Sequence, residues 1–332
     1  MRMFLYTSWA TTLLLACAGV SRGQQTPSVQ PAVNTTAAVV NGQQIPESAV
    51  QRALRRVPPA RQREARAEII KFLIDNALVD QYLTASHVDV DAKTVDAKVE
   101  ELKTAIKQQG KTTLDKALQE MSLTEAELRS QIEAQLRWDK FAVAQSTEQR
   151  TQAYFAQNKE MFDGTTVRAR HILLTPATND PQAIEAAKTK LVGFKKQIEA
   201  QAAQGLEQLP PGTSEAARTA ARHKLVDDAF AALAAKESAC PSKQHGGDLG
   251  YFPRSGMMVE PFARAAFALQ PYEMSDVVTT PFGQHLILVI DRKVGRPIKY
   301  DDVKDFVKEA YGDYLRDAVA NQLRAKATIE IK

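Results

Sequence analysis

The spacing of apolar residues changes once along the chain, near Thr165, and this change limits the folds that the chain can adopt. Residues 167–174 alternate as a β-strand does, and they predict the first strand of a second domain. Before this point, apolar residues recur at intervals of three and four, which indicates helices. They form two sets: Ile70, Ile74, Leu78 and Tyr82 on one helix face, and Val95, Val99, Leu102 and Ile106 on another. We therefore expect a helical domain followed by a domain that contains a sheet.

Local signals mark the ends of elements in the helical part. Residues 37–42 read Ala-Ala-Val-Val-Asn-Gly, which predicts a short strand and a turn. Thr124 and Glu127 have the spacing of a capping box and precede an apolar helical pattern, so a helix is predicted to begin there. Ser146 and Gln149 repeat this signal and predict the start of a further helix.

The second domain is predicted to belong to the α+β class. Strands are expected at residues 276–280 and 284–291, and connections this short require antiparallel pairing. A Pro-Pro-Gly break at residues 210–212 separates two of the helical stretches. The expected helices cover residues 182–203, 216–236 and 261–269, and a last helix carries Val303, Val307, Ala310 and Tyr314 on one face. This last helix lies outside the sheet domain, where it can pack back on the helical domain.

The amino-terminal residues have the pattern of an export signal. Residues 3–16 are apolar and follow a basic residue, and they are too few for a permanent membrane helix. We expect a signal peptide at residues 1–23. Residues 24–36 are rich in Gln, Pro, Ser and Thr, and they predict a flexible linker because they offer almost no apolar surface to bury.

Cys17 allows two routes of processing. Residues 14–17 read Leu-Leu-Ala-Cys and resemble a lipobox, which would lipidate Cys17, whereas residues 21–23 suit an ordinary signal peptidase. The only other cysteine is Cys240, so neither route leaves a pair for an intrachain disulfide. A lipid on Cys17 would be the expected link to a membrane.

The charge of the chain argues against a nucleic-acid partner. The 332 residues carry a formal net charge of +4, and no run of Lys and Arg is interleaved with aromatic residues. Apolar residues make up 44% of the chain, which is ordinary for a globular protein.

The most specific patterns lie in the second half of the chain. They are the segments Arg170–Leu174, Ser238–Phe252, Gly256–Phe262 and Phe282–Leu288. In their order and approximate spacing they resemble the parvulin family of peptidyl-prolyl cis-trans isomerases, over residues 167–292. The helical segments that flank this region, which open with residues 40–42 and close with residues 327–331, are similar to the chaperone domains of the SurA and PrsA type.

The resemblance implies a division into domains. A helical SurA/PrsA-like domain would cover residues 37–164 and would be joined by the carboxy-terminal helix of residues 297–332. A parvulin-type isomerase domain, with a small antiparallel sheet flanked by helices, would cover residues 165–296. The segment 201–224 departs from the family, because it is longer than the usual connection between the first helix and the cysteine.

The resemblance also implies a site, without a cofactor or a metal ion. The residues that it assigns are His171 and His285 as a central pair, Cys240 beside them, Leu249, Met258 and Phe262 as a proline pocket, and Thr280 as a hydroxyl near the histidines. These residues would act on X-Pro bonds of unfolded polypeptides.

Strand periodicity supports the histidine pair independently. It places His171 on one face with Ala169 and His285 on one face with Ile287, so both side chains point into apolar surroundings. A single histidine on such a face is usually an ordinary core residue. Two of them with a cysteine and a Gly-Gly turn indicate a site. The apolar pocket residues, taken without the resemblance, suit ordinary core packing equally well.

Cys240 has three interpretations. It can polarise the histidines and the substrate carbonyl, serve as a small buried apolar residue, or act as a nucleophile activated by histidine. The last would make the protein a Cys-His hydrolase, but no orienting Asn or Asp and no oxyanion motif stands out. We favour the first interpretation.

The glycine-rich turn suits neither a phosphate nor a metal. Gly246, Gly247 and Gly250 lack the strand-to-helix context of a phosphate loop and are expected to supply positive φ angles. His245 and Cys240 alone make a weak zinc case, so His245 is expected to be an exposed loop residue.

We therefore expect an extracytoplasmic bacterial foldase, either periplasmic or lipid-anchored, that rotates X-Pro bonds of exported polypeptides without covalent chemistry. Residues 175–181, after the first strand, contain no basic residue, which favours an unphosphorylated substrate. One alternative is a holdase chaperone whose isomerase domain is inactive. Another is a structural protein of the cell envelope, which only the linker and the lipobox favour.

Overall fold

The computed structural model describes residues 35–332 except 60–61, 111–112 and 177–179. These residues divide into two compact units: residues 155–303 form one, and residues 35–154 with 304–332 form the other. The predicted signal peptide, Cys17 and nearly all of the predicted linker lie outside the described residues. Within the described ranges, no helix has the length and apolar character needed to cross a membrane.

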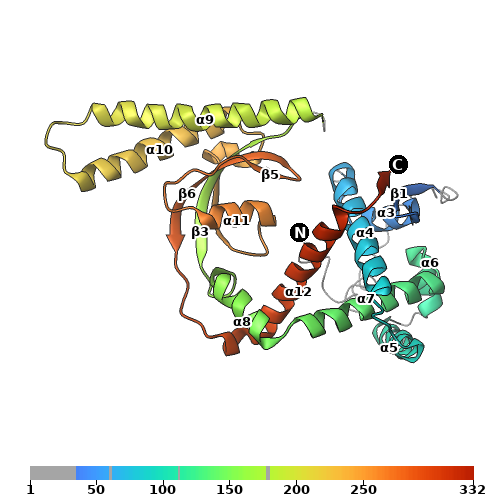
Figure 1. Cartoon of the computed structure of the whole chain (residues 1–332). Coiled ribbons are helices and arrows are strands. Elements are labelled where there is room, and N and C mark those ends of the chain that lie inside the picture. The colour runs from blue at the N-terminus through green and yellow to red at the C-terminus, as the bar shows by residue number, and fades with distance from the viewer. Residues whose placement is uncertain (1–34, 60–61, 111–112, 177–179) are drawn as a thin grey trace. The chain divides into compact units, whose positions relative to one another are not determined.

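The unit of residues 35–154 and 304–332, called the helical unit below, combines helices with a small antiparallel sheet (Figure 1). Its sheet has the order β2-β1-β7. The strands are β1 (Thr36–Val40), β2 (Gln43–Pro46) and β7 (Ile329–Ile331). The helices that precede the other unit are α3 (Glu47–Leu54), α4 (Gln62–Ala85), α5 (Ala92–Gly110), α6 (Leu114–Met121), α7 (Glu125–Gln145) and α8 (Glu148–Gln157), and α12 (Tyr300–Arg324) follows it. The strand and turn predicted at residues 37–42 are confirmed.

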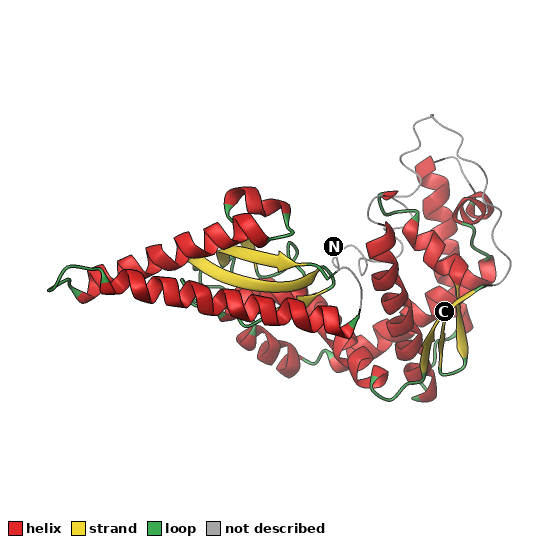
Figure 2. Cartoon of the chain, turned by 90° about the horizontal axis from the view of Figure 1, so that it is seen from above, coloured by secondary structure: helices red, strands yellow, loops and turns green. Residues whose placement is uncertain are grey.

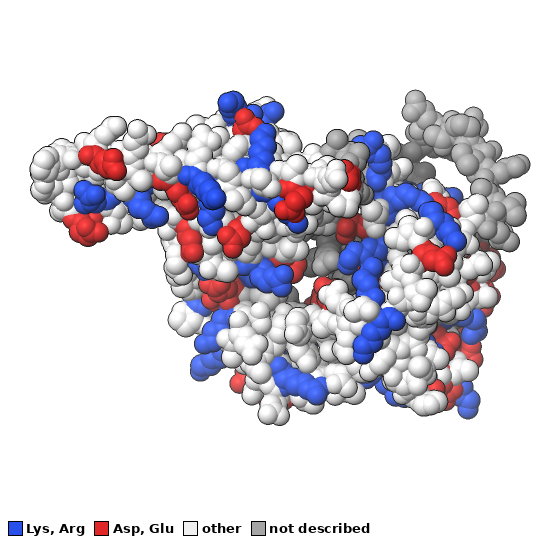
Figure 3. Space-filling view, turned by 45° about the horizontal axis from the view of Figure 1, so that its top comes forward, with Lys and Arg blue, Asp and Glu red and all other residues white. Residues whose placement is uncertain are grey.

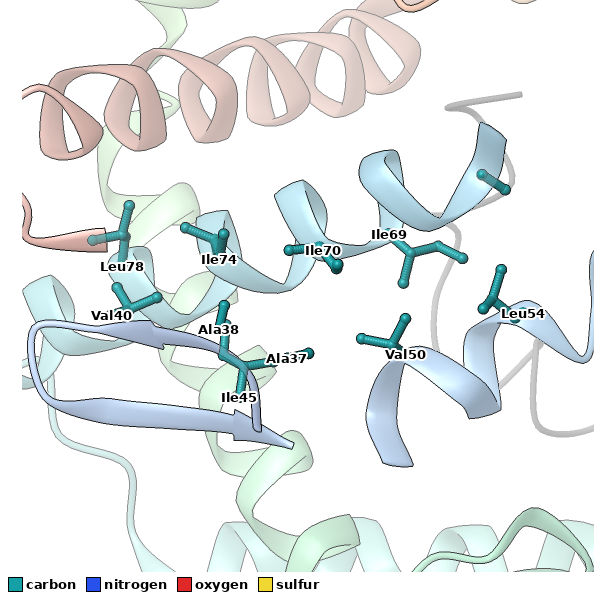
Figure 4. Close-up of a cluster of buried hydrophobic side chains, with 11 residues drawn as sticks. Ala37, Ala38, Val40, Ile45, Val50, Leu54, Ile69, Ile70, Ile74 and Leu78 are labelled. Carbon is teal, nitrogen blue, oxygen red and sulfur yellow. The ribbon is translucent and has the colours of Figure 1, made fainter. Parts of the chain in front are cut away.

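One hydrophobic core of this unit lies between β1, α3 and α4 (Figure 4). Ile70, Ile74 and Leu78 on α4 face Ala38 and Val40 on β1. All five are buried, as the helical spacing predicted for α4. The end of the chain also contributes, because three partly buried residues pack on the same core: Leu323, Ala327 and Ile329.

Two of the predicted helix faces are only partly buried. Tyr82, at the end of the α4 face, is 40% exposed and packs edge-on against Phe141. On α12, Val307 is buried but Tyr314 is 55% exposed and packs against Tyr154. An aromatic side chain at the end of an apolar stripe can therefore lie over a neighbouring ring instead of entering the core.

One of the two predicted capping boxes is present. Thr124 Oγ1 accepts from the Glu127 N–H at 3.1 Å, and Glu127 accepts from the Thr124 N–H at 2.8 Å. The further helix predicted near Ser146 is confirmed as α8, but the predicted capping box is wrong, because Ser146 ends α7 and its N–H bonds to a carbonyl of that helix. Thr147 instead accepts from the Arg150 N–H at 3.4 Å, at the start of α8.

The unit of residues 155–303, called the sheet unit below, is an α+β fold around an antiparallel sheet of order β4-β3-β6-β5. Helices α9 and α10 cover one face and α11 lies on the other (Figure 1). The strands are β3 (Thr166–Leu174), β4 (Asp248–Pro253), β5 (Val278–Thr280) and β6 (Gly283–Lys293). The helices are α9 (Pro181–Glu207), α10 (Glu215–Glu237) and α11 (Glu260–Ala268), with short 3-10 turns at Lys159–Met161 and Pro241–His245. The predicted fold class is confirmed, and β4 was not predicted.

The long segment at residues 201–224 forms the tip of a helical hairpin. Helices α9 and α10 run past the end of the sheet together (Figure 2). They approach closely at Gly205, where an added Cβ would come within 2.8 Å of the Leu225 side chain. Acidic and basic side chains are interspersed on the face of this hairpin seen in Figure 3.

Side chains of β3 and β6 point alternately to the two faces of the sheet, and each face carries an apolar layer. One layer faces α9 and α10 and includes Ile172, Leu286 and Leu288. The other faces α11 and includes Ala169 and Ile287. His171 shares a face with Ala169, and His285 shares one with Ile287, as the sequence predicted, and these faces lie on the α11 side of the sheet.

Candidate active site

The two histidines lie on neighbouring strands and face each other. His171 on β3 pairs with Ile287 on β6, and His285 pairs with Leu173, so the two rings are diagonal neighbours across the strand pair. Their Nδ1 atoms are 3.1 Å apart, and the rings stack with centroids 5.3 Å apart. Both side chains are buried. This geometry requires one ring to donate through Nδ1–H and the other to accept.

The pair is the centre of a chain of hydrogen bonds. His171 Nε2 lies 3.2 Å from Ser242 Oγ, and His285 Nε2 lies 2.7 Å from Thr280 Oγ1. Thr280 Oγ1 also accepts from the Phe282 N–H at 3.1 Å. Because each neutral imidazole has one donor and one acceptor, all of these hydrogen bonds can form whichever of the two rings donates through Nδ1–H. Both arrangements are satisfied with both rings neutral.

Burial keeps both rings neutral at ordinary pH. Removal from water lowers the pKa of His171 to about 4. Burial is also the main cause that lowers the pKa of His285 to about 3, and a charge on the neighbouring His171 would lower that pKa further. The site is therefore polar but uncharged.

Phe262 forms an apolar wall beside the pair. Its ring stands edge-on to His171, with centroids 5.6 Å apart, and to His285, with centroids 5.4 Å apart. Leu249 and Met258 are half-buried and pack against the same cluster. The structure thus brings Phe262 into contact with both histidines and Thr280 into contact with His285, and it places Leu249 and Met258 against the cluster that contains Phe262.

Cys240 precedes the turn that carries Ser242, but its side chain does not join the hydrogen bonds of the histidines. Its backbone N–H donates to Ser238 Oγ at 3.2 Å, and its carbonyl accepts from the Lys243 N–H at 3.0 Å. The half-buried thiol forms no hydrogen bond within the part of the chain that the structure describes. Ser242, which sequence reasoning missed, is the residue of this turn that contacts His171. A serine in a loop carries no periodic signal, and the contact depends on the 3-10 turn that begins at Pro241.

Gly247 lets the turn approach the strand. The His171 N–H donates to the Gly247 carbonyl at 3.0 Å, and Gly247 has a φ of 78°. A Cβ at this position would lie 2.4 Å from the His171 carbonyl oxygen. The predicted positive φ is confirmed, and the close contact explains why glycine suits this position.

No group of three or more His, Cys, Asp or Glu residues in the described ranges is arranged to hold a metal ion. His245 is exposed, as the sequence predicted. Its backbone carbonyl accepts from Arg170 Nη1 at 3.0 Å.

Comparison with protein families shows two matches. Residues 151–293 match the PPIC-type peptidyl-prolyl isomerase domain, and residues 4–142 match the SurA-like N-terminal domain. The chain therefore combines a parvulin domain of the PPIC type with a SurA-like N-terminal domain.

Proteins similar to this chain include foldase proteins. The foldase protein PrsA of Bacillus subtilis is 40% identical over 109 residues, which are 31% of this chain and 36% of that protein. The match thus spans about a third of that relative's length. The PrsA of Halalkalibacterium halodurans is 29% identical over 277 residues, 79% of this chain and 68% of the relative. The crystal structure of PrsA from Bacillus anthracis aligns with 78% of this chain and 96% of its own, at 23% identity and a TM-score of 0.42.

Proposed function

We propose that the protein is a peptidyl-prolyl cis-trans isomerase and a folding chaperone for exported polypeptides. One observation carries the proposal: a buried, uncharged histidine pair with Phe262 edge-on to both rings, within the part of the chain that matches the PPIC-type domain. The similarity to foldase proteins supports the chaperone part.

Rotation about an X-Pro bond breaks no covalent bond, so catalysis depends on the surroundings of the amide and not on a reactive side chain. The barrier to rotation about an X-Pro bond is about 18–20 kcal/mol and comes from amide resonance. An enzyme must bind the twisted amide more tightly than the planar one, and a thousandfold acceleration requires only about 4 kcal/mol of such preference. The twisted amide is less polarised, so a dry and uncharged pocket favours it.

We assign the roles accordingly. Leu249, Met258 and Phe262 would hold the proline ring, and the pair of His171 and His285 would form the uncharged polar floor beside it. Two further residues act on this floor: Thr280 would fix the orientation of His285, and Cys240 would polarise the histidines and the substrate carbonyl as a neighbour rather than as a nucleophile.

The preferred substrate is an unphosphorylated X-Pro segment. A phosphate before the proline needs basic partners, and residues 175–181 contain none. Residues 177–179 of this loop lie outside the described part of the chain.

The helical residues 37–164 and the carboxy-terminal residues 297–332 would cradle unfolded clients, and residues 165–296 would isomerise them. We further propose export through a signal peptide at residues 1–23, to a periplasmic or membrane-anchored location. The anchored location depends on a lipid at Cys17. Mass spectrometry of the mature amino terminus decides this point, since an unmodified start at Gln24 excludes the lipoprotein.

A protease-coupled assay on short unphosphorylated X-Pro peptides tests the proposed activity. Loss of catalysis in Phe262→Ala and His285→Ala, with Cys240→Ala less affected, is the expected result. Folded wild-type protein without any catalysis would favour the alternative, a holdase that only binds unfolded chains.

A further inference from the structure

The loop between β4 and α11 carries part of the apolar wall but has little backbone structure of its own. Residues 254–259 contain neither helix nor strand. In the described part of the chain, no N–H group of residues 255–259 donates to a backbone carbonyl. Met258 nevertheless packs on the cluster of Phe262, whereas its neighbour Met257 is 60% exposed. Something other than backbone pairing must hold Met258 in place.

An ion pair closes this loop at its two ends. Arg254 Nη1 donates to Glu260 Oε2 at 2.8 Å, and Arg254 Nη2 donates to Glu260 Oε1 at 2.7 Å. Arg254 directly follows β4, and Glu260 is the first residue of α11. Two parallel bonds fix both the distance and the orientation of the groups they join. The pair therefore sets how β4 and α11 meet, two residues before Phe262.

The burial of Arg254 suggests a role beyond stability. Its side chain is 10% exposed, and that of Glu260 is 43% exposed. Desolvation of a guanidinium offsets much of the attraction, so apolar replacements of such pairs are often neutral for stability. Fixing one geometry is the remaining advantage. The start of α11 also gains from Glu260, because an acidic side chain complements the helix dipole there and Val259 provides no side-chain cap.

We propose that Arg254 and Glu260 are a positioning pair for the proline pocket. By fixing the ends of the loop, they hold Met258 and Phe262 at the distance from the two histidines that a proline ring requires. They act through these pocket residues and not on the substrate. This inference rests on the isomerase activity proposed above.

The test compares four variants of the full chain. Arg254→Met and Glu260→Gln each break the pair, and the double exchange Arg254→Glu with Glu260→Arg reverses it. Lys190→Met is the matched control, because it breaks a 2.7 Å ion pair with Glu237 between α9 and α10, on the other side of the sheet. We measure kcat/KM on an X-Pro peptide, thermal unfolding, and the NMR signals of the His171 and His285 ring protons.

Displacement of Met258 and Phe262 is expected to lower kcat/KM by about tenfold in both single variants. The control should stay within about twofold of the wild type, and the double exchange should recover part of the loss. The histidine signals should shift in the single variants, because the Phe262 ring stands edge-on to both rings. An ion pair with a purely structural role would change the unfolding midpoint without moving these signals or being rescued in activity.

The failures of the two proposals are distinguishable. If the wild type catalyses and folded Glu260→Gln keeps kcat/KM within about twofold, the positioning role is overturned and the isomerase stands. If the folded wild type does not catalyse, the isomerase proposal fails. The histidine signals then decide the positioning of Phe262 alone, and unmoved signals in Glu260→Gln overturn it.

Discussion

Gly247→Ala isolates the close contact between the glycine turn and the strand that carries His171. An added Cβ would lie 2.4 Å from the His171 carbonyl oxygen and 3.0 Å from the Ala234 side chain, and φ is 78°. A side chain at such a φ costs about 1–2 kcal/mol, and the steric conflict adds about 1–3 kcal/mol. Gly250→Ala is the matched control, because its φ is 68° but no atom lies within 4 Å of an added Cβ. The effect of alanine on the unfolded chain cancels between the two variants.

The assay must report on the sheet unit itself. Trp138 lies in α7 of the helical unit, so its fluorescence does not serve this purpose. Hydrogen exchange of the amides in residues 166–174, followed by mass spectrometry, measures the opening of β3 directly. We expect Gly247→Ala to lower the opening free energy by about 1–3 kcal/mol more than Gly250→Ala does. Equal losses in the two variants would refute the reasoning, since only the steric conflict distinguishes them.

Three further predictions concern the hydrogen-bonded histidine pair and the helical unit. Burial lowers the pKa of His171 to about 4 and that of His285 to about 3, whereas an unfolded histidine titrates near 6.5, so below that pH the folded protein binds fewer protons than the unfolded chain. The stability contributed by these residues should be complete above about pH 6.5 and should fall as the pH is lowered toward 4. The kcat/KM should be flat between about pH 6 and 8. Denaturant unfolding against pH checks this, and a stability that rises on acidification contradicts it. Thr280→Val should cost about 1–3 kcal/mol and lower kcat/KM, because it leaves His285 Nε2 without its 2.7 Å partner. Thr279→Val is the control: it also removes a 2.7 Å hydrogen bond, to Gln284 Oε1, but leaves the hydrogen bonds of the histidines intact, so kcat/KM should change little. Equal effects on kcat/KM in the two variants would count against a role for the bond between Thr280 and His285. Thr124→Ala removes the capping box of α7 and should cost about 1 kcal/mol in an unfolding curve followed by Trp138 fluorescence, and an unchanged midpoint contradicts the assigned cap.

The sequence predicted those elements whose apolar period decides which side is buried. The α4 and α5 faces, β3 and β6 fall in this class, and so does the inward direction of both histidines. Strand β4 was missed because its residues are mostly half-buried, with no alternation to detect. Strand β7 was missed for a similar reason, since its residues are largely exposed. Edge strands of this kind are defined by their partners and not by their own pattern.

The site was predicted in part. The family motif led to His171, His285 and Phe262, which the structure brings into contact. The contact of Ser242 with His171 depends on how a loop turns back over a strand, and local spacing does not encode this. The ion pair of Arg254 and Glu260 was missed because nothing in a six-residue separation outside a helix predicts contact.

The central claim is that the site beside Phe262 catalyses rotation about X-Pro bonds. NMR exchange spectroscopy of an unphosphorylated proline peptide, with a catalytic amount of the full chain, measures this rotation without a coupling protease. The account predicts exchange peaks between the cis and trans signals with the wild type, and their loss with folded Phe262→Ala. Equal exchange in both samples would place catalysis outside this pocket, and no exchange in either would contradict the isomerase.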